Sequence, residues 1–161
     1  MAGRGWGPWV SDKAIAGTIG EGRRVEAVEV KTGCTIPTTH LESHVQTFGW
    51  QAPGETKNGV WCGPGFELSS SGPNHECLGT QGRGLRLEAL KFSMYSGWGA
   101  MTKADGVRLC MQAHLAGTGW QSIRCSSYID PSKRQSSSTA MVGTTGQGRQ
   151  IEALRMWYDT L

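Results

Sequence analysis

Tryptophans that follow glycines are the residues of this sequence best suited to contact a ligand. Three of the Gly-Trp dipeptides serve as landmarks and place an indole at Trp6, Trp50 and Trp120. An aromatic face can pack against the C–H groups of a sugar ring, while amide, imidazole and carboxylate groups bind the hydroxyls. These three tryptophans are therefore candidate glycan platforms. The alternative is that a tryptophan at a fixed position of a repeat belongs to the core.

One set of polar residues that could complete such a site lies in turn-like segments. Asp12, Asn58 and Asp130 each stand between a Gly-Trp and a Gly-Thr dipeptide. Their side chains could bind sugar hydroxyls. Asp and Asn also favour turns for purely conformational reasons, so turn formation is an equally good interpretation.

A second set of polar residues leads into the Gly-Trp dipeptides. His44 and Gln46 precede Gly49-Trp50, and His114 precedes Gly119-Trp120. Side chains alternate between the two faces of a strand. These residues therefore point outward if their neighbours Val45 and Leu115 face the core.

Signatures of catalysis and of metal or cofactor binding are absent from the sequence. It contains no Gly-x-Ser-x-Gly, no His-Glu-x-x-His, no phosphate-binding loop and no Cys-x-x-Cys. Its Gly-x-Gly segments precede expected strands, whereas a dinucleotide site needs such a segment to open a helix. We therefore predict that the protein is not an enzyme and has no catalytic residues, no metal ligands and no cofactor.

Composition and charge exclude several other classes. The chain has 161 residues, of which 37% are hydrophobic and 18% charged, as expected of a folded domain rather than a disordered chain. The net charge of +3 comes from scattered Lys and Arg, so no nucleic-acid partner is expected. No apolar stretch approaches the roughly 18 residues of a membrane-spanning helix. Residues 1–10 do not read as a secretory signal. We expect no membrane insertion.

A segment of the form Gly-Thr-x-Gly-x-Gly-x-x-x-Glu-Ala is repeated at residues 17–27, 79–89 and 143–153. The chain is therefore expected to be one domain of three repeats, here called copy one (about 5–33), copy two (about 40–97) and copy three (about 106–161). Stretches rich in Ser, Gly and Pro at about 52–77 and 122–141 are expected loop insertions.

Each repeated segment leads into an expected strand, at about 24–30, 85–94 and 150–157. Glycines open these runs and no helical N-cap pattern holds in all three, which argues against helices. Period two places Leu87 and Ala89 on one face, with Glu88 and Leu90 on the other. The small alanine of each copy suggests close packing about a shared axis. We predict an all-β fold with pseudo-threefold symmetry, β-prism-like, with a β-trefoil as the alternative.

The repeated glutamate, at Glu26, Glu88 and Glu152, stands among apolar neighbours. It either binds a ligand or has a structural role, such as pairing with the arginine two residues earlier, which copy three replaces by Gln150. An active site normally needs one asymmetric group of residues. A carboxylate repeated three times therefore favours the structural role.

Copy one lacks the segment that carries His44 in copy two. A neighbouring element, a strand donated by a partner chain or residues that precede the sequence would supply it. The second option predicts a homo-oligomer.

The five cysteines are Cys34, Cys62, Cys77, Cys110 and Cys125. Cys62 and Cys77 bracket one loop-like stretch, and Cys110 and Cys125 bracket another. The spacing predicts two disulfides in an oxidising compartment or thiols in a reducing one. An odd number leaves at least one cysteine unpaired or paired between chains.

The segments His-Val-Gln-x-x-Gly-Trp at 44–50, Gly-Thr-x-Gly-x-Gly and Arg-x-Glu-Ala together resemble the clostridial hydrophobic-W (ChW) repeat. The resemblance covers 6–30, 44–94 and 114–157 and is best at 44–50 and 79–90. The long insertions, the missing segment of copy one and Ala116 at the place of Gln46 depart from the pattern.

The resemblance implies an extracellular or cell-surface protein that binds polysaccharide, cell wall or other macromolecules. The expected function is that of a lectin-like, non-catalytic module that recognises glycans or cell-surface polysaccharide, with several sites on one molecule as a further expectation. The alternative is a protein-interaction or structural adhesion module without sugar binding.

Overall fold

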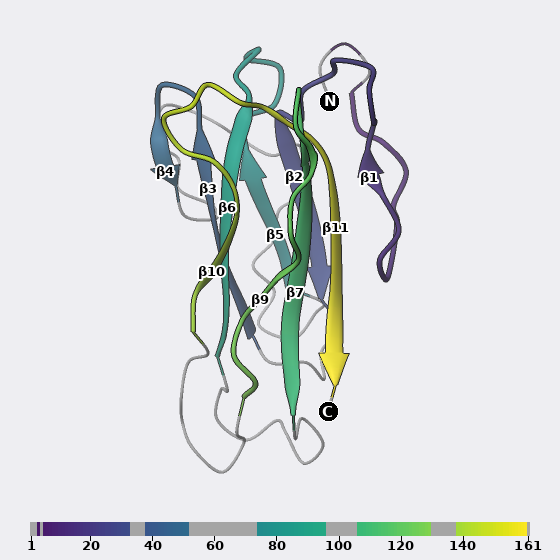
Figure 1. Ribbon diagram of the computed structural model, residues 1–161, viewed down its shortest axis with the longest axis vertical. Helices are drawn as coiled ribbons and strands as arrows, with labels where there is room; N and C mark the ends of the chain where they lie inside the picture. The colour runs from purple at the N-terminus through teal and green to yellow at the C-terminus, as the bar shows by residue number, and fades with distance from the viewer. Residues whose placement is uncertain are drawn as a thin grey trace.

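The structure is a computed structural model that describes residues 3, 5–32, 38–51, 74–95, 106–129 and 138–160. These residues contain strands and no helix, so the prediction of an all-β fold is confirmed. The strands are β1 (Ala16–Gly17), β2 (Ala27–Thr32), β3 (Thr38–Val45), β4 (Gly49–Gln51), β5 (Asn74–Gly79), β6 (Leu87–Tyr95), β7 (Val107–Leu115), β8 (Gly119–Trp120), β9 (Arg124–Cys125), β10 (Ala140–Gly143) and β11 (Ile151–Thr160). The long strands run along the long axis of the molecule (Figure 1).

Three antiparallel sheets each join strands from two different copies. Their orders are β1-β11-β7-β8 with β9 beside β7, β10-β6-β3-β4, and β2-β5. The strand after each Gly-Thr loop pairs with the strand that enters the next such loop, and copy three pairs with copy one. The same register recurs each time, with these Cα partners: Ala27 and Gly79, Ala89 and Gly143, Ala153 and Gly17.

Close backbone contact at this register explains the repeated glycine and alanine. A Cβ added to Gly79 would lie 2.3 Å from the Glu26 carbonyl oxygen, and the added Cβ of Gly143 would lie 2.3 Å from that of Glu88. Neither distance is tolerable for a real side chain, so only glycine fits. The following threonine then donates its backbone N–H to the same carbonyl, as Thr80 does to Glu26 over 2.7 Å.

Hairpins complete two of the three sheets. The β3–β4 hairpin joins β6 through β3, and the β7–β8 hairpin joins β11 through β7. The glycine of each Gly-Trp dipeptide closes its hairpin, since Gly49 and Gly119 have φ angles of 74° and 78°. Each hairpin turn is bonded to the loop of its own copy, through Gln46 N–H to the Arg86 carbonyl in copy two. Figure 1 shows the hairpin turns and the Gly-Thr loops at the same end of the molecule.

A β-bulge at the repeated glutamate changes the predicted faces. β3 pairs Val45 with Leu87 and His44 with Ala89, so Glu88 is an extra residue on β6. The sequence prediction placed Leu87 and Leu90 on opposite faces, and this was wrong. Both belong to one buried core cluster, because the inserted residue shifts the alternation of side chains. The same irregularity occurs at Glu152 in β11.

The core lies between the sheets and draws on all three copies. It includes Val25 and Val30 from copy one, Leu41, Val45, Leu87, Leu90, Phe92 and Met94 from copy two, and Leu109, Met111, Leu115, Ile151 and Leu154 from copy three. Because each copy contributes only part of this cluster, no copy could bury its apolar face alone.

The expected insertions contain strand segments at their ends. β5 begins at Asn74, and β9 and β10 lie within or overlap 122–141. A disulfide between Cys110 and Cys125 joins β7 to β9, as the sequence spacing predicts. Cys34 and Cys62 lie outside the described residues. Within those residues, no helix has the length and apolar character needed to cross a membrane.

Candidate functional site

The repeated glutamate lies at the centre of a polar cluster on the outer side of its sheet. In copy two, Arg86 Nε donates a hydrogen bond to Glu88 Oε1 over 2.9 Å. His44 Nδ1 lies 3.1 Å from Glu88 Oε2. The ring nitrogen does not have the alignment of a hydrogen bond, and the two groups form an ion pair when the histidine is protonated. The glutamate is buried, so its carboxylate is held by protein groups rather than offered to a ligand.

The other copies retain part of this cluster. In copy three, His114 Nδ1 lies 3.2 Å from Glu152 Oε2, while Gln150 donates to the Gly22 carbonyl instead of to the glutamate. In copy one, Arg24 Nε donates to Glu26 Oε1 over 3.1 Å. The structural interpretation of the glutamate, as the partner of the arginine two residues earlier, is confirmed in copies one and two.

Two of the predicted tryptophan platforms pack against this cluster. The ring of Trp50 meets that of His44 edge to face at a centroid distance of 5.3 Å. Lys91 Nζ lies 3.8 Å from the centroid of Trp50. Trp120 repeats the arrangement with His114 and with Arg155, whose guanidinium lies 4.5 Å from the ring centroid. A cation thus covers one face of each indole and would have to move before a sugar could stack there.

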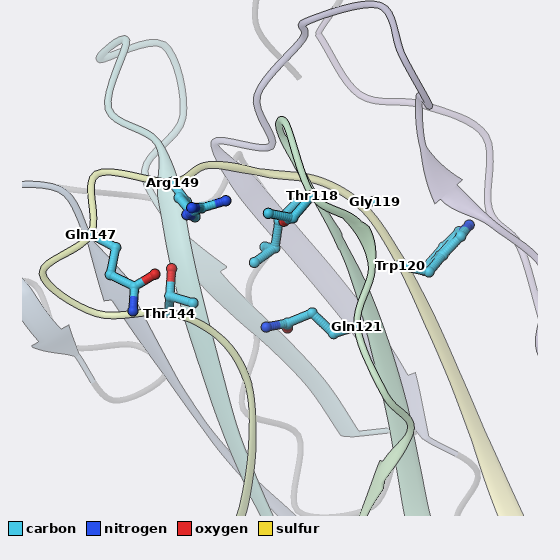
Figure 2. A pocket seen from close by; sticks show the side chains of 8 residues that line it. Thr118, Gly119, Trp120, Gln121, Thr144, Gln147 and Arg149 are labelled. Carbon is cyan, nitrogen blue, oxygen red and sulfur yellow. The ribbon is translucent and has the colours of Figure 1, made fainter.

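An open cleft of about 310 Å³ lies between the β7–β8 turn and the Gly-Thr loop of copy three. Figure 2 shows the side chains around it, with the Trp120 ring pointing away from the polar groups. The lining residues are Leu115, Thr118, Gly119, Trp120, Gln121, Thr144, Gln147 and Arg149.

Hydrogen bonds between a side chain and the backbone fix one side of this cleft. Gln121 Oε1 accepts the Gly143 N–H over 2.6 Å, and Gln121 Nε2 donates to the Gly143 carbonyl over 3.3 Å. These two bonds tie the hairpin to the start of the Gly-Thr loop. The side chains of Thr118, Gln147 and Arg149 make no hydrogen bond or ion pair with any residue that the structure describes. These three can therefore serve a ligand without breaking an existing contact.

The equivalent position of copy two is apolar. Phe48 occupies the place of Thr118 in the hairpin, and Leu85 occupies the place of Arg149 in the loop. Both are partly buried and pack against the core. In copy one, Glu21 and Arg23 stand at the places of Gln147 and Arg149 and form an ion pair of 3.0 Å. The polar cleft, with its three unbonded side chains, is thus a property of copy three.

The residues predicted as a glycan site do not converge on one place. His44 contacts Trp50, and His114 contacts Trp120, in two separate clusters. Gln46 lies partly buried in the β3–β4 turn. The four other predicted residues belong to other parts of the chain. Trp6 is 44% exposed, Asp12 occupies an exposed turn with a φ angle of 37°, and Asn58 and Asp130 lie outside the described residues.

Sequence reasoning missed Thr118, Gln147 and Arg149. The signal that could have found them is the difference between copies at matched positions, which replaces an apolar pair by a polar one. As to metals, the described part of the chain holds no group of three or more His, Cys, Asp and Glu side chains placed to bind an ion.

Comparison with known proteins supports the resemblance that the sequence suggests. The described residues define an all-β protein of repeated strand units. Residues 1–32 match the sequence model of the Clostridial hydrophobic W (ChW) family. The match covers copy one, and the Gly-Trp and Gly-Thr-x-Gly-x-Gly landmarks recur in copies two and three. No curated protein and no solved structure matched the chain.

Proposed function

We propose that this protein is a lectin-like, non-catalytic module that binds glycans, and that the cleft of copy three is its binding site. The observation that carries the proposal is the cluster of Thr118, Gln147 and Arg149 around an open cleft, where their polar groups have no partner among the described residues.

The chemistry of the three side chains suits sugar hydroxyls. A threonine hydroxyl and a glutamine amide each donate and accept, and a guanidinium donates several bonds in one plane. Arg149 further favours an acidic sugar, since its charge has no carboxylate partner among the described residues. A volume of about 310 Å³ is at the small end of ligand sites and suits the end of a saccharide chain rather than a long polymer groove.

We propose that binding through this cleft involves one site per chain. Phe48 and Leu85 fill the matched position of copy two, and the Glu21–Arg23 ion pair occupies that of copy one. Several sites on one chain would therefore require surfaces other than this cleft. Strong binding to a cell surface would come from multiple chains or a polymeric ligand.

We also propose that the three sheets form a pseudo-threefold, β-prism-like arrangement. The recurrence of the glycine–alanine register in all three sheets supports this arrangement. A second line of support is that the hairpins of copies two and three are bonded to their loops in the same way.

The proposal is tested by filling the cleft with the residues of copy two. The double variant Thr118→Phe/Arg149→Leu should keep the fold, because these residues occupy the same place in copy two. It should weaken binding to glycans selected on an array by about tenfold or more, since hydrogen bonds to a charged group contribute about 1.5–3 kcal/mol each. The control is Arg83→Leu in the exposed loop of copy two, which should bind normally. Equal glycan binding by wild type and the double variant, in titration calorimetry, would reject this site.

The alternative function is a protein-interaction or structural adhesion module. It is favoured by a group of exposed apolar side chains in copy one, namely Trp6, Trp9, Val10, Ile15 and Ile19. Exposed apolar groups of this kind often mark protein contacts. The absence of any array signal from folded protein, together with capture of a protein partner that depends on Trp6, would favour this function.

A further inference from the structure

Among the residues that the structure describes, the sheet of copy one lacks a strand that the other two sheets contain. In those sheets the strand after the Gly-Thr loop lies between two neighbours: β6 between β10 and β3, and β11 between β1 and β7. Its counterpart β2 pairs with β5 alone among the strands of the described residues. In the described residues, β2 has no strand on the side where β6 pairs with β3. Such an edge can pair with an added strand.

The polar cluster of copy one is incomplete in a matching way. Glu88 and Glu152 each have a histidine within 3.1 Å and 3.2 Å, and that histidine comes from β3 or β7. Glu26 is equally buried but contacts only Arg24 among the described residues. A buried carboxylate with one cationic partner gains more from a second than an exposed one does.

The tryptophan of copy one differs from its counterparts in exposure and in ring contacts. Trp50 and Trp120 are half-buried against their histidines. Trp6, at the matched position, is 44% exposed, and no aromatic or cationic contact to it occurs among the described residues. In the described part of the chain the strand, the histidine and the cover of the indole are all absent from copy one, as expected if a single element supplies all three.

We propose that β2 is a docking edge for an extended segment of another polypeptide, which adds antiparallel to β2 and places a histidine opposite Ala27. This register is the one in which His44 lies opposite Ala89 and His114 opposite Ala153. The added histidine contacts the Glu26 carboxylate. The interaction is a β-strand addition, in which backbone bonds supply affinity and alternate side chains supply selectivity.

The neighbouring sheets also define the rest of the docking sequence. Residues of β7 that flank the histidine, Ala113 and Leu115, are buried in the core, and the equivalent Val45 of β3 is buried too. The residue two before the histidine is Gln112 in β7 and Glu42 in β3. It lies opposite the position that Glu29 occupies in β2, where an acidic residue would be repelled. A segment patterned on β7 is therefore a better fit than one patterned on β3.

A synthetic peptide of residues 107–115 with Cys110→Ser is the probe for this proposal. Added to isotope-labelled protein, it should shift the backbone amide signals of residues 26–30, and a labelled version should bind in fluorescence anisotropy. Two matched peptides serve as controls. His114→Ala in the peptide should weaken binding about five- to tenfold, as for the loss of a close contact with a buried carboxylate. Ala113→Pro should abolish binding because proline cannot take part in the ladder.

Coupling between protein and peptide identifies the contact. With Glu26→Gln protein, the wild-type and His114→Ala peptides should bind with equal affinity, whereas Glu152→Gln protein should still distinguish them. If a variant fails to fold, the proposal is judged by the amide shifts of the wild-type protein on addition of the wild-type peptide. No binding of the β7 peptide, or shifts that centre away from β2, would overturn the proposal. Binding that ignores the histidine would overturn the assigned register. None of these readouts involves sugar, so the result is independent of the glycan proposal.

Discussion

At the scale of single residues, the repeated glycine and alanine record a contact between copies rather than a ligand site. The Gly143 backbone lies so close to β6 that an added Cβ would be 2.3 Å from the Glu88 carbonyl oxygen and 2.5 Å from the Ala89 Cα. The glycine that opens each Gly-Thr loop is therefore required by the close approach of a neighbouring strand from another copy.

This contact predicts a large cost for a single methyl group. Gly143→Ala should lower the free energy of unfolding by about 2–3 kcal/mol, because the strand must shift to admit the methyl group. Gly146→Ala is the matched control, since its φ is also positive but nothing lies within 4 Å of its added Cβ. It should cost only about 1–2 kcal/mol of backbone strain. Urea denaturation measures both, and equal costs would contradict the close approach.

The repeated glutamate differs between copies in the number of its partners. Glu88 contacts both Arg86 and His44, and Glu26 contacts Arg24. Removal of a buried carboxylate leaves its partners without a counter-charge.

Glu88→Ala should therefore destabilise the protein more than Glu26→Ala, by about 1 kcal/mol or more. The measurement is thermal and urea unfolding of both variants. The His44→Ala variant and the Glu88→Ala/His44→Ala double variant complete a double-mutant cycle. A coupling energy near zero would show that the 3.1 Å approach of His44 to Glu88 contributes nothing to stability.

At the scale of elements, the β-bulges explain what the sequence could and could not predict. The glycine-rich openings and the lack of a shared helical N-cap pattern predicted strands at about 24–30, 85–94 and 150–157, where β2, β6 and β11 lie. The bulge at Glu88 could not be predicted, because it depends on the register with β3, which no local pattern encodes. The position of His44 against Trp50 follows from the register of β3 with β4, in which these two residues are Cα partners. The sequence predicted that His44 points outward, but not that the Trp50 ring lies against it.

The strand β9 is held to β7 in two ways. The Cys110–Cys125 disulfide closes a separation of 15 residues, and Ser126 bonds to Leu109 through both its N–H and its hydroxyl. In the chain-entropy account, a loop of this size contributes about 3 kcal/mol.

The double variant Cys110→Ala/Cys125→Ala should thus unfold at lower denaturant, with a loss of about 3 kcal/mol in the free energy of unfolding. Amide signals of residues 124–129 should broaden or shift, while those of the β3–β4 hairpin stay unchanged. A variant as stable as the wild type would show that the Ser126 bonds alone hold β9.

At the scale of the whole molecule, each sheet joins one copy to the next, and the third copy returns to the first. The repeat in the sequence predicts equivalent units but not this exchange of strands, because pairing partners far apart in sequence leave no local signature. The difference between copies is equally important. Copy three has a polar cleft, copy two has apolar side chains at that position, and in copy one β2 has a single strand partner among the described residues. Three similar units thus offer three different surfaces.

The most direct measurement of the central claim locates the ligand on the molecule. Isotope-labelled protein is titrated with the best glycan from an array, and backbone amide shifts are mapped onto the three copies. The account predicts the largest changes at residues 118–121 and 144–149, with little change at the matched residues 48–51 and 80–85. Changes centred on copy one or copy two would contradict the assignment of the binding site to copy three.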